Sequence, residues 1–137
     1  MSDSIEYISV LKKILTLLKN SKLEYLKASD ESNHSKDKRY FNLQSTLRNR
    51  FFQDVTKLLR SLNVEVESLV IHRLNFEQMV ISSIKKSNHT HLYNCVKYDK
   101  KLLELYDEAL AFDKNALFLN NQQEKVSESV SEGIYFL

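Results

Sequence analysis

Proline is absent from the 137 residues of this chain, and Gly133 is its only glycine. Tight turns of β-proteins draw repeatedly on both residue types, so the composition argues against a fold built on many such turns. Hydrophobic residues make up 42% of the sequence, which is enough for one sizeable core in a chain of this length. We therefore predict one all-α domain over residues 1–137, made of long helices joined by a few loops.

Apolar residues recur every three or four positions in four segments, which is the spacing of one face of an α-helix. The apolar face of the third segment is wide enough to line the interior of a bundle, and that of the fourth is weaker than the others. The pattern predicts helices over about residues 4–29, 38–62, 92–112 and from 116 towards the C-terminus.

The segments between these helices predict how the bundle is connected. Residues 29–38 are polar throughout and indicate a loop. The break at 113–115 is short, so the helices on either side of it are expected to be antiparallel neighbours. Residues 63–90 form a long connection, and the apolar spacing within 69–85 predicts a shorter helix lying across the bundle. Such a crossover lets the two helical hairpins run up-down and then down-up.

The third predicted helix carries a carboxylate on its apolar face. Cys95, Asp99 and Leu102 follow one another at spacings of four and three residues, and Tyr106 continues the stripe. A charge among apolar groups is costly unless it is paired or bound to a metal ion. Asp99 is therefore expected either to be a metal ligand or to be satisfied by protein groups or solvent. The candidate protein groups are Lys97, Lys100 and the hydroxyls of Tyr25 and Tyr106.

Two further acids lie beside predicted apolar faces. Glu24 continues one edge of the face of the first helix, and it points either inward or to a solvated boundary. Asp54 lies at the edge of the stripe on the second helix. It is either a second core acid or a surface acid paired along the helix with Lys57 or Arg50.

The histidines and the cysteine give weak signals. Glu31 and His34 have the spacing of a Glu-x-x-His pair, but they fall in the predicted loop. His72 is expected to be packed or hydrogen-bonded rather than a ligand. His89 and His91 precede the third helix and are not expected to bind metal. Cys95 lies on a predicted buried face, where thiols are usually inert, so nucleophilic catalysis has little support.

Charge and the cysteine count limit the partners and the compartment. The net charge is +2, and the 20 basic and 18 acidic residues are interspersed, so no strong footprint for nucleic acid is present. A single cysteine excludes an intrachain disulfide and suits a reducing cytosol. No apolar run approaches the roughly 18 residues of a membrane span. The N-terminal residues are acidic and lack a cleavage-site pattern, so no signal peptide is expected. The sequence predicts a cytoplasmic protein.

Basic residues gather in three places, which keeps open a nucleic-acid or helix-in-groove module. Most of them lie opposite apolar stripes, where a solvated face is expected to be charged. They are Lys36, Lys38 and Arg39, then Arg48 and Arg50, and then Lys97, Lys100 and Lys101.

Several short pieces of the sequence carry a likeness through their order and spacing. They are VLKKIL at 10–15, Glu24, Tyr25, Lys27 and Ala28, His72 and Arg73, Asn94, Cys95 and Asp99, LYDEAL at 105–110 and LNNQ at 119–122. Together they resemble a bacterial ferritin-like family of four-helix bundles of unknown function. The resemblance covers residues 10–132 and implies a crossover helix between two helical hairpins. It also implies a homodimer with a stress-related role.

Di-iron members of the ferritin-like superfamily use four carboxylates and two histidines that point into the bundle. This chain departs from that set. Leu23 stands where the family usually has an acid, and Val130 stands where it often has a histidine. At most the carboxylates of Glu24, Asp54 and Asp99 remain, which is too few for a di-iron oxidase site.

We therefore predict a non-catalytic ferritin-like bundle with a degenerate di-metal site, acting through protein–protein contacts as a homo-oligomer and without a cofactor. The alternative is a divergent iron- or manganese-binding protein or oxidase that uses Glu24, Asp54 and Asp99. No substrate or partner protein follows from the sequence.

Overall fold

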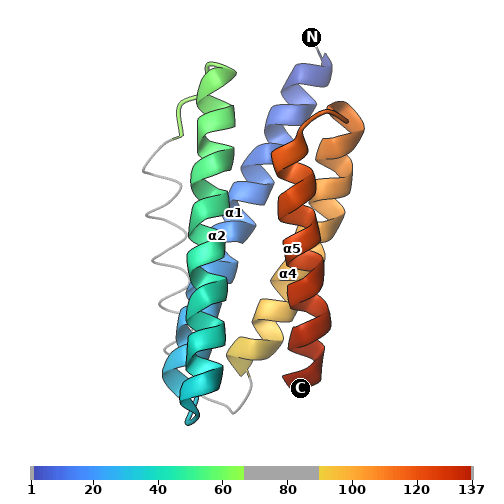
Figure 1. The fold of residues 1–137 in the computed structure, drawn as a ribbon. Coiled ribbons are helices and arrows are strands. Elements are labelled where there is room, and N and C mark those ends of the chain that lie inside the picture. The colour runs from blue at the N-terminus through green and yellow to red at the C-terminus, as the bar shows by residue number, and fades with distance from the viewer. Residues whose placement is uncertain (1, 67–89, 137) are drawn as a thin grey trace.

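The computed structural model of this chain describes residues 2–66 and 90–136 (Figure 1). Within these residues it has four α-helices and no strand, which confirms the predicted all-α bundle. The crossover helix predicted for residues 69–85 lies outside the described part. The helices are α1 (Ser2–Glu31), α2 (Ser35–Ser61), α4 (Thr90–Phe112) and α5 (Leu117–Phe136).

The connection between α1 and α2 is shorter than the predicted loop over residues 29–38. The Ser32 N–H donates hydrogen bonds to the carbonyls of Ala28 (3.1 Å) and Ser29 (3.2 Å), which closes α1. The Lys38 N–H donates to the carbonyl of His34 at 3.0 Å, which opens α2. Exposed helix ends need no apolar residues, so a polar run can be helical almost throughout.

Neighbouring helices run antiparallel. α1 leads away from the end of the bundle that holds the N-terminus, and α2 returns to it (Figure 1). α4 begins at the same end as α2, and α5 returns beside it (Figure 1). α1 packs against both α2 and α4, and α4 packs against α5. The short break at 113–115 therefore joins antiparallel neighbours, as predicted.

The core is divided into two apolar clusters with polar side chains between them. On α1, the larger cluster ends at Leu18 and the smaller one begins at Tyr25. On α4, Cys95 belongs to the smaller cluster and Leu102 to the larger, and Asp99 lies between them. A polar layer therefore crosses the bundle at the level of Asp99.

The two neighbours of α5 differ in how closely they approach it. A Cβ atom on Gly133 would lie 2.8 Å from Cγ2 of Val96 on α4, so the single glycine permits close packing of these two helices. α2 and α5 contact each other least among the packed pairs. Polar side chains bridge this wider seam, as where the Ser129 hydroxyl donates to Oε1 of Gln44 at 2.8 Å.

Candidate functional site

Asp99 is fully buried, as its position on the apolar stripe predicts. Its Oδ1 atom accepts hydrogen bonds from the Ser21 hydroxyl at 2.8 Å and from Nε of Arg48 at 3.3 Å. Its Oδ2 atom accepts hydrogen bonds from the Tyr25 hydroxyl at 2.7 Å and from Nη2 of Arg48 at 2.9 Å. Four hydrogen bonds fill about as many acceptor positions as a carboxylate offers.

Arg48 supplies the positive charge that balances Asp99. It is fully buried, and its Nη1 donates to Oε1 of Gln44 at 3.2 Å. Its guanidinium carbon lies 5.1 Å from the centroid of the Tyr25 ring, which adds a cation–π contact. Because Ser129 donates to the same Gln44 oxygen, the network reaches α5. We call this set the buried polar cluster; it consists of Ser21, Tyr25, Gln44, Arg48, Asp99 and Ser129.

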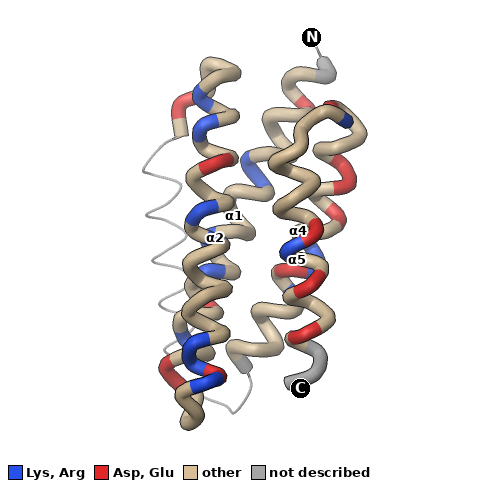
Figure 2. The backbone as a smooth tube through the Cα atoms, viewed as in Figure 1, with Lys and Arg blue, Asp and Glu red and all other residues tan. Residues whose placement is uncertain are grey.

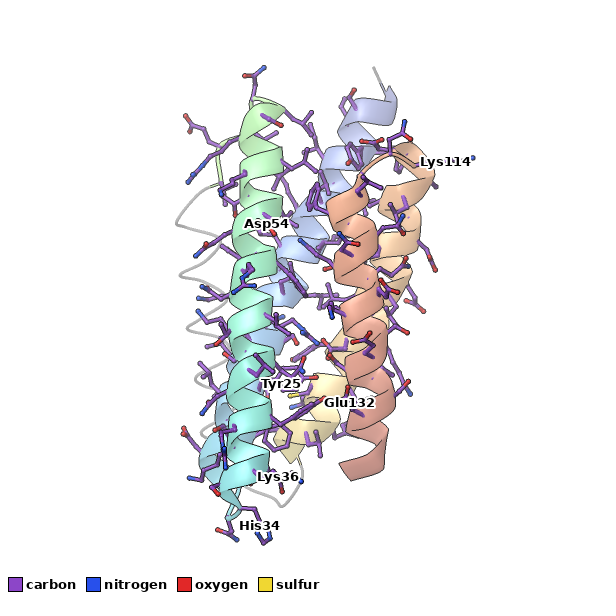
Figure 3. All side chains as sticks on the ribbon, in the orientation of Figure 1. Tyr25, His34, Lys36, Asp54, Lys114 and Glu132 are labelled. Atoms are coloured by element: carbon purple, nitrogen blue, oxygen red, sulfur yellow. The ribbon has the colours of Figure 1, made fainter. Side chains whose placement is uncertain are left out.

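The buried polar cluster draws on all four described helices. α1 provides Ser21 and Tyr25, α2 provides Gln44 and Arg48, α4 provides Asp99 and α5 provides Ser129. The ring of Tyr25 lies between the helices rather than at the surface (Figure 3). Paired charges of this kind fix which faces meet, because any other register would bury a charge without its partner.

The pKa shifts in this layer keep each group in one protonation state. Burial raises the pKa of the Tyr25 hydroxyl well above its ordinary value, and the Asp99 charge raises it further. Burial alone would lower the pKa of the Arg48 guanidinium, but the adjacent Asp99 carboxylate raises it above its ordinary value. Burial, followed by the charges of Asp99 and Glu24, raises the pKa of the Cys95 thiol. Tyr25 therefore stays a neutral donor, and Cys95 stays a protonated thiol.

The raised pKa of Tyr25 predicts a loss of stability in alkali. The ordinary value is 10.0, so above that pH the unfolded chain releases this proton while the folded chain keeps it. Stability should fall by up to about 1.4 kcal/mol per pH unit from this one group. In urea unfolding between pH 8 and pH 11, Tyr25→Phe should flatten the fall. Tyr93→Phe is the control, measured at a protein concentration low enough to keep the chain monomeric, because the Tyr93 side chain is exposed in the single chain; an equal flattening by both variants would contradict the assignment.

Of the partners predicted for Asp99, the structure confirms only Tyr25. The Tyr106 hydroxyl donates instead to Oε1 of Gln122 at 2.7 Å, and Nε2 of Gln122 donates to the Phe51 carbonyl at 3.4 Å. Lys97 and Lys100 are exposed on the outer side of α4.

Glu24 is buried, so the alternative of a solvated boundary residue is wrong. Its Oε2 atom lies 2.7 Å from Nδ1 of His91, which is itself buried near the start of α4. Nε2 of the same ring lies 3.3 Å from Oε1 of Glu31, a half-exposed residue two turns farther along α1. His91 thus joins the start of α4 to two carboxylates of α1.

The three acids proposed as metal ligands have different surroundings. Asp99 is paired with Arg48, and Glu24 is paired with His91. Asp54 is partly buried on α2, six residues and about 9 Å beyond Arg48. It lies closer than Tyr25 to the end of the bundle at which α2 ends (Figure 3). Among the described residues, no group of three or more His, Cys, Asp or Glu side chains is placed to hold a metal ion. The metal role of these acids stays a prediction.

Arg48 is the residue of this cluster whose role the sequence reasoning missed. The sequence places it among basic residues most of which are expected on solvated faces, but its side chain is fully buried. A signal was present, because Arg48 follows Gln44 by four positions and precedes Phe51 and Val55 by three and seven, on the same helix face.

Comparison of the chain with protein-family models, with curated proteins and with solved structures gives no match. Within residues 2–66 and 90–136, no helix is both long enough and apolar enough to cross a membrane.

Proposed function

We propose that this chain is a non-catalytic helical bundle that acts through protein–protein contacts. The observation that carries the proposal is the buried Asp99–Arg48 pair, in which a protein cation stands where a metal site would need open carboxylate oxygens. The ferritin-like ancestry and the stress-related role remain part of the proposal through the sequence resemblance alone.

The chemistry of the donor set argues against a di-metal centre in this bundle. Both oxygens of Asp99 already accept hydrogen bonds from Arg48 and a hydroxyl. A metal ion at Asp99 would have to displace Arg48, and a buried guanidinium without its partner is strongly destabilising. The second carboxylate of the predicted set, Glu24, faces His91. The residues present therefore do not fit the four carboxylates and two histidines of a di-iron site.

Access also argues against catalysis within the bundle. Arg48 and Asp99 are fully buried, and the Tyr25 side chain is almost so. A substrate needs a concave, reachable pocket with polar groups at its wall. The raised pKa of Cys95 also keeps its thiol out of the reactive thiolate form. Among the described residues, the outer surface of the helices is therefore the part available for function.

Metal content tests the non-catalytic half of this proposal. The full chain would be expressed with iron and with manganese, purified without chelator and measured by elemental analysis. We expect no metal above background in the wild-type chain, in Asp99→Asn, in Asp54→Asn or in the control Asp30→Asn, which changes an exposed acid outside the predicted ligand set. Near-stoichiometric metal in the wild-type chain and the control that is lost in Asp99→Asn and in Asp54→Asn would overturn the proposal and favour the alternative of a divergent iron or manganese protein.

A further inference from the structure

The outer side of α4 carries one continuous stripe of exposed side chains. Its members follow one another at intervals of four, four, three, four and four residues, which places them on a single helix face. From first to last the stripe spans about 28 Å of helix. Its residues are Tyr93, Lys97, Lys101, Glu104, Glu108 and Phe112. We call this set the α4 stripe.

The order of residues along the α4 stripe is self-complementary. An aromatic residue lies at each end, two lysines fill one half and two glutamates fill the other. The exposed acidic residues of α4 lie toward the end at which it joins α5 (Figure 2). The sign of charge therefore reverses at the midpoint, between Lys101 and Glu104. A helix with this pattern matches a copy of itself that runs in the opposite direction.

We propose that the α4 stripe is the contact surface of an antiparallel homodimer of this chain. A two-fold axis through the midpoint of the stripe sets Lys97 of one copy opposite Glu108 of the other, and Lys101 opposite Glu104. The same operation sets Tyr93 opposite Phe112. The contact is isologous, so each pairing occurs twice and the assembly closes at two copies.

The aromatic ends of the stripe supply apolar area for this contact. Tyr93 is 60% exposed and Phe112 is 39% exposed. Phe112 is oriented by the Tyr7 ring, whose centroid lies 5.9 Å from its own. A surface hollow of about 510 Å³ lies beside the basic half, and Leu17, Tyr93 and Val96 contribute its apolar walls. Under the two-fold operation, Phe112 of the second copy arrives at the Tyr93 end of this hollow.

The charges of the stripe select the second copy over other partners. A uniformly acidic surface, whether a peptide or a nucleic acid, would attract the lysine half and be repelled by the glutamate half. A parallel second copy would bring like charges together. Lys101 and Glu104 already form an ion pair at 3.1 Å within one chain, so across the axis they would make a four-charge network. A single exposed ion pair contributes little affinity. In this dimer the ion pairs therefore set the antiparallel direction of the two α4 helices, while the aromatic residues supply contact area.

This inference rests on the proposed function in one respect, namely that the bundle works through protein contacts. Its test is a charge exchange between the two halves of the stripe, read by sedimentation or light scattering over a concentration series. The acidic variant is Lys97→Glu with Lys101→Glu, and the basic variant is Glu104→Lys with Glu108→Lys. The control is Lys36→Glu with Lys38→Glu, an equal charge change at exposed positions of α2.

We expect the wild-type chain and the control to form dimers, and each stripe variant alone to dimerise roughly a hundred-fold more weakly because like charges face each other. An equimolar mixture of the two variants should restore a one-to-one dimer, which also shows that both variants are folded. A monomeric wild-type chain, variants that dimerise as well as the control, or a mixture that stays monomeric would each overturn the proposal. Metal analysis of the same samples tests the proposed function separately, because that outcome does not depend on the oligomeric state.

Discussion

Replacing Arg48 with methionine is expected to lower the free energy of unfolding by about 3–5 kcal/mol. Methionine roughly fills the space of the arginine stem, so packing is largely kept. The Asp99 carboxylate, however, loses the guanidinium with which it is paired and stays buried with only the hydroxyls of Ser21 and Tyr25 as hydrogen-bond donors among the described residues. Urea unfolding at neutral pH, followed by circular dichroism, measures the difference between the variant and the wild-type chain.

The matched control for Arg48→Met is Arg50→Met. Arg50 is exposed two residues farther along the same helix, and its loss should change stability by no more than about 0.5 kcal/mol. Equal losses in the two variants would contradict the buried ion pair.

A double-mutant cycle separates the pair from general damage to the core. Arg48→Met and Asp99→Asn each remove one charge, and the double variant removes both. Because each single variant leaves a buried charge alone, the double variant should lose less than the sum of the two single losses. Strict additivity would show that Arg48 and Asp99 do not interact in the folded chain.

Helix positions could be predicted from the sequence because each helix buries one apolar stripe. The third helix was predicted over 92–112 and is observed as Thr90–Phe112. The burial of Asp99 followed from the same periodicity. The loop predicted for 29–38 was too long, because the exposed ends of α1 and α2 bury almost nothing and so carry no apolar period.

Partners across helices could not be predicted in the same way. Periodicity shows which face of a helix is buried, but it does not show which residue on another helix lies at the same level. Asp99 and Arg48 are 51 positions apart, and only the packing of α2 and α4 around α1 brings them together. Arg48 lies on the same predicted buried face as Gln44 and Phe51. Because arginine is rarely buried without a partner, the sequence alone nevertheless favours a surface position for it.

His91 was set aside in the sequence for a related reason. It lies at the very start of α4, before the repeating apolar spacing of that helix begins. The number of residues between His91 and Glu24 therefore does not show that the two side chains meet. Glu24 and Glu31 are seven positions apart and share a face of α1. In three dimensions the His91 ring lies between their carboxylates, at 2.7 Å and 3.3 Å.

Replacing His91 with leucine is expected to lower the free energy of unfolding by about 2–3 kcal/mol, because the buried Glu24 carboxylate loses the imidazole nitrogen that lies 2.7 Å from it. The Glu24 side chain is 1% exposed, so water cannot readily replace the imidazole. The first turn of α4 should also open more often, since the ring joins that turn to α1. Urea unfolding measures the global loss, and hydrogen exchange of the first amides of α4 measures the local opening.

Two further variants decide whether the lost contact between the His91 ring and the Glu24 carboxylate is the cause. His34→Leu changes an exposed histidine at the α1–α2 connection (Figure 3), and it should alter stability by less than about 0.5 kcal/mol. Adding Glu24→Gln to His91→Leu should recover part of the loss, because a neutral amide costs less to bury than a carboxylate. If Glu24→Gln brings no recovery, the His91 ring acts by filling space at the start of α4, and the Glu24 carboxylate plays no part in holding the two helices together.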